Sequence, residues 1–273
     1  MAETSPTGPV RALLSRAIHA GLAAGWWVGG VRVLLTSVPK CGTHLVRRLL
    51  DVVGLPTRCE VPWDIAPASL AETLRQHRGS AVVGHLPSFP ARLACVDSAG
   101  VRALFISRDP RDQVVSHLHY VRANAAHPVH PYLRDCFPDD DEALLAIIHG
   151  VRFSEAASLP DVDTLFRGCL EWRTLGAVYS TTFERLIGPR GGGSESAQAQ
   201  EVAAMLRHIG FPLRTRSAVA VMAHRLFSVA SPTFRIGRIG GWRGAFKPRH
   251  VDTFKQVAGS LLVDLGYERD LDW

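Results

Sequence analysis

Four short apolar runs limit the folds open to this chain more than any other feature. They are rich in branched aliphatic residues, each ends in turn residues, and they cover positions 31–37, 81–84, 101–107 and 177–183. Their apolar residues are continuous rather than alternating, a pattern typical of strands that are buried on both faces of a parallel sheet. The runs therefore predict a central parallel sheet with helices on both sides.

The segments between these runs carry apolar residues at helical spacing. Predicted helices cover positions 43–53, 67–77, 110–126, 141–149, 161–175, 196–209 and 251–265. Asp109 and Pro110 form a typical start for the third of these helices, because aspartate caps a helix and proline fits its first turn. The glycine-rich segment 188–194 is predicted to be a mobile surface loop rather than a domain boundary, since its two flanks share one composition.

Strands that alternate with helices, without an internal repeat, predict one doubly wound α/β domain. We expect this domain over residues 31–273, preceded by an N-terminal extension of residues 1–30. A sheet covered on both faces can hold ~250 residues without splitting into two domains, which fits the length of 273 residues.

Composition excludes several classes of protein. Hydrophobic residues make up 47% of the chain and charged residues 21%, which excludes a disordered chain, a coiled coil and a collagen. The five cysteines include no C-x-x-C pair, so we expect neither a disulfide framework nor a thiolate zinc site, and a reducing compartment. The apolar stretch at 17–30 is too short and too rich in glycine for a membrane helix and lacks a clear cleavage signal. The sequence therefore predicts a cytoplasmic protein without a transmembrane segment.

The charge of the chain indicates an anionic partner. The formal net charge is +6 at pH 7 and the isoelectric point is about 9.4. Nucleic acid, an anionic membrane surface and a phosphorylated cofactor all fit the charge alone. A basic nucleic-acid-binding protein is the non-enzyme alternative, but the arginines are scattered and no binding motif is present.

The turn after the first run has the residues of an anion site. Lys40, Gly42 and Thr43 lie between the first predicted strand and the first predicted helix. A helix that begins there directs backbone N–H groups and the positive end of its dipole at a bound anion. The spacing differs from the G-x-x-x-x-G-K-[ST] loop of nucleoside triphosphatases, so phosphate binding without a metal fits better. The alternative is an ordinary turn with a solvated lysine.

Polar residues also follow the second and third runs, at the same predicted edge of the sheet. His85 follows the second run and is placed to accept a proton from a bound hydroxyl, although a lone histidine is more often structural. Arg108 follows the third run, and Ser116 lies two turns into the next helix, so the two side chains could share one phosphate. The alternative for Arg108 and its neighbours through Asp112 is a surface charge network.

Four motifs, taken in order, resemble those of the PAPS-dependent sulfotransferases. They are PKCGT at 39–43, GHLP at 84–87, RDPRD at 108–112 followed by Ser116, and FRIGRIGGWR at 234–243. The resemblance covers the chain from about 31 to 246. It implies a single-domain, P-loop-like, three-layer α/β fold with a central, mainly parallel sheet flanked by helices. It also implies transfer of the sulfuryl group of 3′-phosphoadenosine 5′-phosphosulfate (PAPS) to a hydroxyl, or alternatively an amine, of an acceptor, with no metal required.

The resemblance also implies the roles of individual residues. Lys40 would contact the phosphosulfate and stabilise the leaving phosphate, and His85 would act as general base. Because the extracellular branch of the family uses a glutamate as base, Glu171 and Glu184 are reserve candidates. The implied cofactor-binding residues are Lys40, Cys41, Gly42, Thr43, His44, Arg108, Ser116, Arg235 and Gly237.

Several positions depart from the family pattern. Cys41 replaces the usual serine and His44 the second threonine, so two hydroxyls are missing from the phosphosulfate loop. Leu45 stands where cytosolic members have a tryptophan, Ile236 replaces the lysine of the R-K-G element, and Phe183 replaces a frequent tyrosine. These departures predict weaker nucleotide binding, or a reliance on other aromatic residues.

A small-molecule or nucleoside kinase is the enzymatic alternative. A metal site is also conceivable, because four histidines lie close in the sequence. His117 and His119 point away from each other on a helix, and His127 and His130 lie in a proline-rich loop, so a wall of the acceptor pocket is the favoured interpretation. We expect an acceptor that is a small, partly apolar or glycolipid-like molecule with a hydroxyl, and the sequence leaves a homodimer open.

Overall fold

The computed structural model describes residues 30–154, 157–212, 215–226 and 237–273. Its centre is a parallel sheet of five strands in the order β2-β3-β1-β4-β7. The strands are β1 (Arg32–Ser37), β2 (Thr57–Glu60), β3 (Ser80–Gly84), β4 (Arg102–Ser107) and β7 (Val178–Thr182). The predicted parallel sheet is thereby confirmed, and the carboxyl ends of all five strands lie at one edge.

The degree of burial of each strand explains whether the sequence predicts it. β1 pairs with both β3 and β4, and these three strands are almost wholly buried. β2 lies at the edge of the sheet and alternates between half-buried and exposed residues. Its four polar and small residues form no apolar run, which is why the sequence analysis missed this strand.

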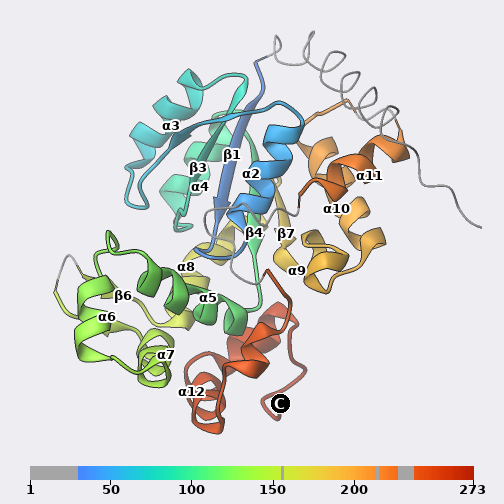
Figure 1. Ribbon diagram of the computed structural model, residues 1–273. Helices are drawn as coiled ribbons and strands as arrows, with labels where there is room; N and C mark the ends of the chain where they lie inside the picture. The colour runs from blue at the N-terminus through green and yellow to red at the C-terminus, as the bar shows by residue number, and fades with distance from the viewer. Residues whose placement is uncertain (1–29, 155–156, 213–214, 227–236) are drawn as a thin grey trace, which may run out of the picture.

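Helices cover both faces of the sheet (Figure 1). Leu34 of β1 packs on one face, in a core with helices α3 (Pro67–Gln76), α4 (Pro90–Ser98), α5 (Pro110–Ala123), α7 (Asp140–His149), α8 (Val162–Leu170) and α12 (Pro248–Leu265). Val33 and Leu35 pack on the other, with α2 (Thr43–Val52), α9 (Phe183–Leu186), α10 (Glu195–His208) and α11 (Arg216–His224). This is the predicted three-layer architecture, built on the alternation of side chains along a strand.

Helices α5, α7 and α12 gather beyond the carboxyl ends of the strands, together with helix α6 (His130–Cys136) (Figure 1). The remaining elements are the two-stranded antiparallel sheet of β5 (Val151–Arg152) and β6 (Ser158–Leu159), and the 3-10 helices η2 (Glu171–Thr174), η3 (Pro189–Gly191) and η4 (Gly241–Gly244). The helix predicted at 161–175 is thus divided into α8 and η2.

The glycine-rich segment 188–194 lies largely at the surface, as predicted, but it contains the 3-10 helix η3 and two buried glycines, Gly188 and Gly191. Gly191 is buried, and its carbonyl accepts a hydrogen bond of 3.0 Å from the N–H of Ile239. A side chain at this position would lie 2.5 Å from the carbonyl oxygen of Gly237. Gly191 is therefore required here because two stretches of backbone approach each other closely.

Two further predictions concern the N-terminal extension and the absence of a transmembrane segment. The predicted extension of residues 1–30 lies outside the described residues except for Gly30. Within the described ranges, no helix combines the length and the apolar character that crossing a bilayer requires.

Candidate functional site

The turn between β1 and α2 has an unusual backbone. Lys40 has a φ of 66°, and among the described residues it is the only one other than glycine with a positive φ. Such a conformation costs about 1–3 kcal/mol in a residue with a side chain, and strain of this kind gathers at functional sites. Gly42 follows with a φ of 102° and is the N-cap of α2. A Cβ on Gly42 would lie 2.9 Å from the Phe183 ring, so the turn tolerates only glycine there.

A chain of hydrogen bonds links this turn to His85. The hydroxyl of Ser37 lies 2.8 Å from Thr43 Oγ1 and 2.9 Å from His85 Nδ1. The segment that follows His85 is held by Leu86, whose N–H donates to Thr36 Oγ1 at 3.1 Å and whose carbonyl accepts from Trp172 Nε1 at 2.7 Å. β1 and β3 are neighbours in the sheet, which is why the predicted base lies beside the predicted anion site.

The surroundings of His85 favour a neutral imidazole. The residue is exposed, yet desolvation by the protein around the ring and the charge of Lys40 both act to lower its pKa, and the net pKa is below its ordinary value. Nδ1 lies 3.4 Å from the carbonyl oxygen of Ser37, which can only accept a hydrogen bond. With the proton on Nδ1, this carbonyl accepts it and Nε2 carries a free lone pair.

Lys40 faces an aromatic side chain from α5. Its Nζ lies 3.6 Å from the centroid of the Tyr120 ring, a cation–π contact. Partial burial of the ammonium group lowers the pKa of Lys40 to about 8. At neutral pH the group still carries a positive charge.

Arg108 and its neighbours are buried, so the alternative of a surface charge network is wrong. Arg108 Nη2 donates to Asp112 Oδ2 at 3.2 Å and to the carbonyl of Arg238 at 2.7 Å, and the guanidinium lies 4.1 Å above the Phe183 ring. Arg108 is 8% exposed, and its Nε has no hydrogen-bond partner among the described residues. In the described part of the chain, Nε of Arg32 and of Arg92 also lacks a partner, so Arg108 differs by its place at the carboxyl end of β4, where an anion could satisfy its N–H.

The remaining cofactor-binding candidates lie in different environments. The Cys41 thiol is fully buried in the core, where desolvation raises its pKa, so this side chain is not available to a ligand. His44 is exposed on α2, and its pKa is lowered by burial and by the nearby charges of Arg47 and Lys40. Ser116 is half-buried on α5.

The last of the four motifs, at 234–243, lies within the described residues only from Gly237 onward. Gly237 has a φ of 57° and precedes Arg238, whose carbonyl binds Arg108. Arg235, predicted to close over the same phosphate, and Ile236 lie outside the described residues.

Glu184 and Glu171, the two reserve candidates for the general base, differ in whether their carboxylates are already hydrogen-bonded. One Glu184 oxygen accepts from the N–H of Asp109 and the other from the Tyr267 hydroxyl, each at 3.0 Å. Both carboxylate oxygens are therefore already bonded, and Glu184 supports the start of α5. Glu171 is exposed on η2, where its N–H donates to Ser88 Oγ at 3.2 Å.

His117 of α5 and His127 of the following loop lie near Lys40. His117 is buried, and desolvation followed by the nearby His127, Lys40 and His85 lowers its pKa to about 3. The His127 ring meets the rings of His117 and Tyr120 edge-on, with centroids 6.1 and 5.7 Å apart. Among the described residues, no group of three histidine, cysteine, aspartate or glutamate side chains could hold a metal ion.

Two supporting residues escaped the sequence analysis. Gln113 is fully buried and donates from Nε2 to the carbonyl of Pro39 at 3.1 Å, which holds the turn before Lys40. Ser37 connects Thr43 with His85. A buried polar residue in an otherwise apolar strand is the signal that could have indicated Ser37, whereas nothing in the sequence pattern indicates Gln113.

Comparison with known proteins places this geometry in a known fold. No family model matches the sequence, and no curated protein matches it. The structure of mouse sulfotransferase SULT7A1 complexed with PAP matches with a TM-score of 0.62 and 17% identity, over 87% of each chain.

Two structures of retinol dehydratase match with a TM-score of 0.56 and 14% identity. One is in complex with androsterone and the inactive cofactor PAP and covers 91% of this chain and 86% of its own. The other is in complex with retinol and PAP and covers 94% and 96%. The chain therefore has the fold that these structures share, as the four sequence motifs implied.

Proposed function

We propose that this protein transfers the sulfuryl group of PAPS to a hydroxyl of a small, largely apolar acceptor. The observation that carries the proposal is the convergence of Lys40, His85 and Arg108 at the carboxyl ends of three adjacent strands, β1, β3 and β4. One of these groups is a strained lysine, one is a neutral base, and one is a buried arginine with an unpartnered N–H. PAP in all three matching structures supports the choice of nucleotide.

The chain's own residues supply the chemistry of an in-line transfer. His85 Nε2 takes the proton of the acceptor hydroxyl as the acceptor oxygen bonds to sulfur. The bond between sulfur and the bridging phosphate oxygen breaks, and its electron pair stays on the nucleotide. Lys40 and the N-terminus of α2 neutralise the negative charge that develops there. Electrostatic stabilisation of this kind dominates the related transfer of phosphoryl groups.

The 3′-phosphate of the nucleotide is assigned to Arg108 and Ser116, with Arg235 and Gly237 closing over it. The unpartnered Nε of Arg108 supports this assignment, because a phosphate oxygen would satisfy a buried donor. Cys41, Gly42, Thr43 and His44 are assigned to the phosphosulfate, with Cys41 contributing its backbone alone. Thr43 Oγ1 already bonds Ser37, so binding through this hydroxyl requires that contact to be shared or exchanged.

The acceptor is assigned to the space beside Tyr120, His117 and His127. These rings are uncharged at neutral pH or aromatic, which disfavours an acidic acceptor and suits an apolar alcohol, including a glycolipid-like one. Androsterone and retinol in the retinol dehydratase complexes are molecules of this kind. A pKa below the ordinary value keeps the His85 imidazole neutral at neutral pH, as a general base must be.

The proposal assigns this activity to a sulfotransferase domain of residues 31–273 in a cytoplasmic protein. All five cysteines are free, which supports a reducing compartment. A monomer and a homodimer would both accommodate the reaction.

Transfer of radioactive sulfate from labelled PAPS to a panel of acceptors tests the proposal. The panel contains a hydroxysteroid, retinol, a simple phenol and a glycolipid alcohol. Label should appear in at least one acceptor with the wild-type protein and with His149→Ala, an exposed control at the end of α7, and not with Lys40→Ala. Absence of transfer together with absence of PAP binding by calorimetry would refute the function. Magnesium-dependent phosphoryl transfer from ATP would favour a kinase instead.

A further inference from the structure

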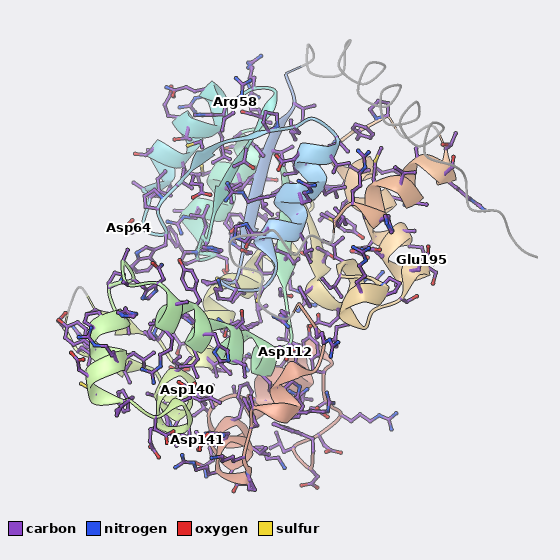
Figure 2. All side chains as sticks on the ribbon, in the orientation of Figure 1. Arg58, Asp64, Asp112, Asp140, Asp141 and Glu195 are labelled. Carbon is purple, nitrogen blue, oxygen red and sulfur yellow. The ribbon has the colours of Figure 1, made fainter. Side chains whose placement is uncertain are left out.

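Three hydrogen bonds converge on the buried carboxylate of Asp112. Its Oδ2 accepts from Arg108 Nη2 at 3.2 Å and from the N–H of Gly240 at 2.8 Å, and its Oδ1 accepts from the N–H of Trp242 at 2.8 Å. The Asp112 side chain is only 2% exposed. Figure 2 shows Asp112 at the start of α5, beside the C-terminal part of the chain.

The position of Asp112 in α5 does not by itself explain these contacts. An acidic residue in the first turn ordinarily serves the N-terminus of its own helix. Here Asp109 is the N-cap, and its Oδ1 accepts the N–H of Arg111 at 2.9 Å. The Asp112 carboxylate is thereby free to bind a segment 128 to 130 residues away in the sequence.

That segment, residues 238–242, is tied to Arg108 in two ways. The carbonyl of Arg238 accepts directly from Arg108 Nη2, and Asp112 bridges the same nitrogen to Gly240. The carboxylate also balances the charge of a guanidinium that is 8% exposed. Both contacts fall on Nη2, which leaves Arg108 Nε without a partner among the described residues.

We propose that Asp112 is a positioning residue for recognition of the nucleotide 3′-phosphate, because it holds Arg108 and residues 238–242 in one arrangement before the nucleotide binds. This inference rests on the proposed function and deepens it. Asp112 does not touch the phosphate. It acts by fixing the direction of the Arg108 donors and by holding the backbone next to Gly237.

The test is the preference for PAP over adenosine 5′-monophosphate, which lacks the 3′-phosphate. Both affinities are measured by calorimetry for the wild type and for Asp112→Asn. The amide keeps the size of the side chain, but its NH₂ group cannot accept a hydrogen bond, and its negative charge is lost. PAP affinity should fall about tenfold, the effect of losing one charged hydrogen bond, while the affinity for the monophosphate should change less than about twofold.

Glu201→Gln is the matched control. Glu201 is a carboxylate of 1% exposure on α10 that accepts from the Tyr179 hydroxyl at 3.0 Å and from Arg185 Nε at 2.6 Å. Its loss should lower the unfolding temperature and leave the preference for PAP intact. A purely structural role of Asp112 would give the same pattern as Glu201, and that result overturns the inference.

Hydrogen exchange on the wild-type protein provides a test that needs no variant. PAP should slow exchange of the Gly240 and Trp242 amides, and the monophosphate should not, because only PAP binds Arg108 through a 3′-phosphate. Equal effects of the two nucleotides would overturn the inference even if Asp112→Asn failed to fold. If the wild type binds neither nucleotide, the proposed function itself fails, which is a separate outcome.

Discussion

The pKa of Lys40 leads to a quantitative prediction for the pH dependence of sulfuryl transfer. Burial lowers this pKa from 10.5 to about 8. Only the protonated ammonium stabilises the leaving phosphate, so activity should fall as pH rises through 8. At pH 9 a group with this pKa is about one-tenth protonated, so kcat/KM should be about tenfold below its plateau. A lysine with the ordinary pKa would still be almost fully charged there.

The assay is the initial rate of labelled sulfate transfer between pH 5 and 10, at constant ionic strength. The profile of kcat/KM reports the free enzyme, to which the lowered pKa applies. Bound PAPS places negative charge beside Lys40, which favours the ammonium and raises its pKa. The alkaline limb of kcat should therefore lie at higher pH than the alkaline limb of kcat/KM.

Lys40→Arg separates this titration from alkaline unfolding. The guanidinium stays charged across the range, so the residual activity of this variant should show no alkaline limb at pH 8 to 9. A wild-type profile that stays flat to pH 10 would refute the reasoning. So would an identical alkaline limb in Lys40→Arg, since some other group would then be responsible.

Three further predictions follow from the same contacts. His85→Ala should lower kcat by about 10²–10⁴-fold, the usual contribution of a general base, while PAP affinity by calorimetry stays unchanged; full activity would remove His85 from the mechanism. Arg108→Ala should weaken PAP binding, and an unchanged calorimetric affinity would remove Arg108 from the site. The pKa of His117 is lowered to about 3 in the folded state. The unfolded state therefore binds a proton at this residue more strongly, and His117 lowers the free energy of unfolding as pH falls from about 6.5 towards 3. His117→Leu should therefore reduce the pH dependence of the free energy of unfolding in urea over that interval, by at most about 1.4 kcal/mol per pH unit; an unchanged slope would contradict burial of a neutral imidazole.

The strands differ in how far local sequence predicts them. β1, β3 and β4 were predicted because strands buried on both faces form continuous apolar runs. β2 was missed because an edge strand buries only alternate side chains and is four residues long here. The 3-10 helix η2 was merged with α8 in the prediction, since the apolar spacing does not distinguish the two helix types.

The candidate site was predicted in part for a similar reason. Lys40, His85 and Arg108 each follow an interior strand, and parallel strands bring their carboxyl ends to one edge. Cys41 shows where this reasoning stops. The family resemblance implied contact with the phosphosulfate, but the thiol is buried in the core.

The sequence alone determined the type of sheet and which residues follow its interior strands, because both depend on patterns within a few consecutive residues. Only the tertiary structure decided how those residues are held. Asp112 accepts from Gly240, the Lys40 ammonium lies over the Tyr120 ring, and Glu184 accepts from Asp109 and Tyr267. Each of these contacts joins residues that are 75 or more positions apart in the sequence, the nearest pair being Asp109 and Glu184. No local sequence pattern predicts such a contact.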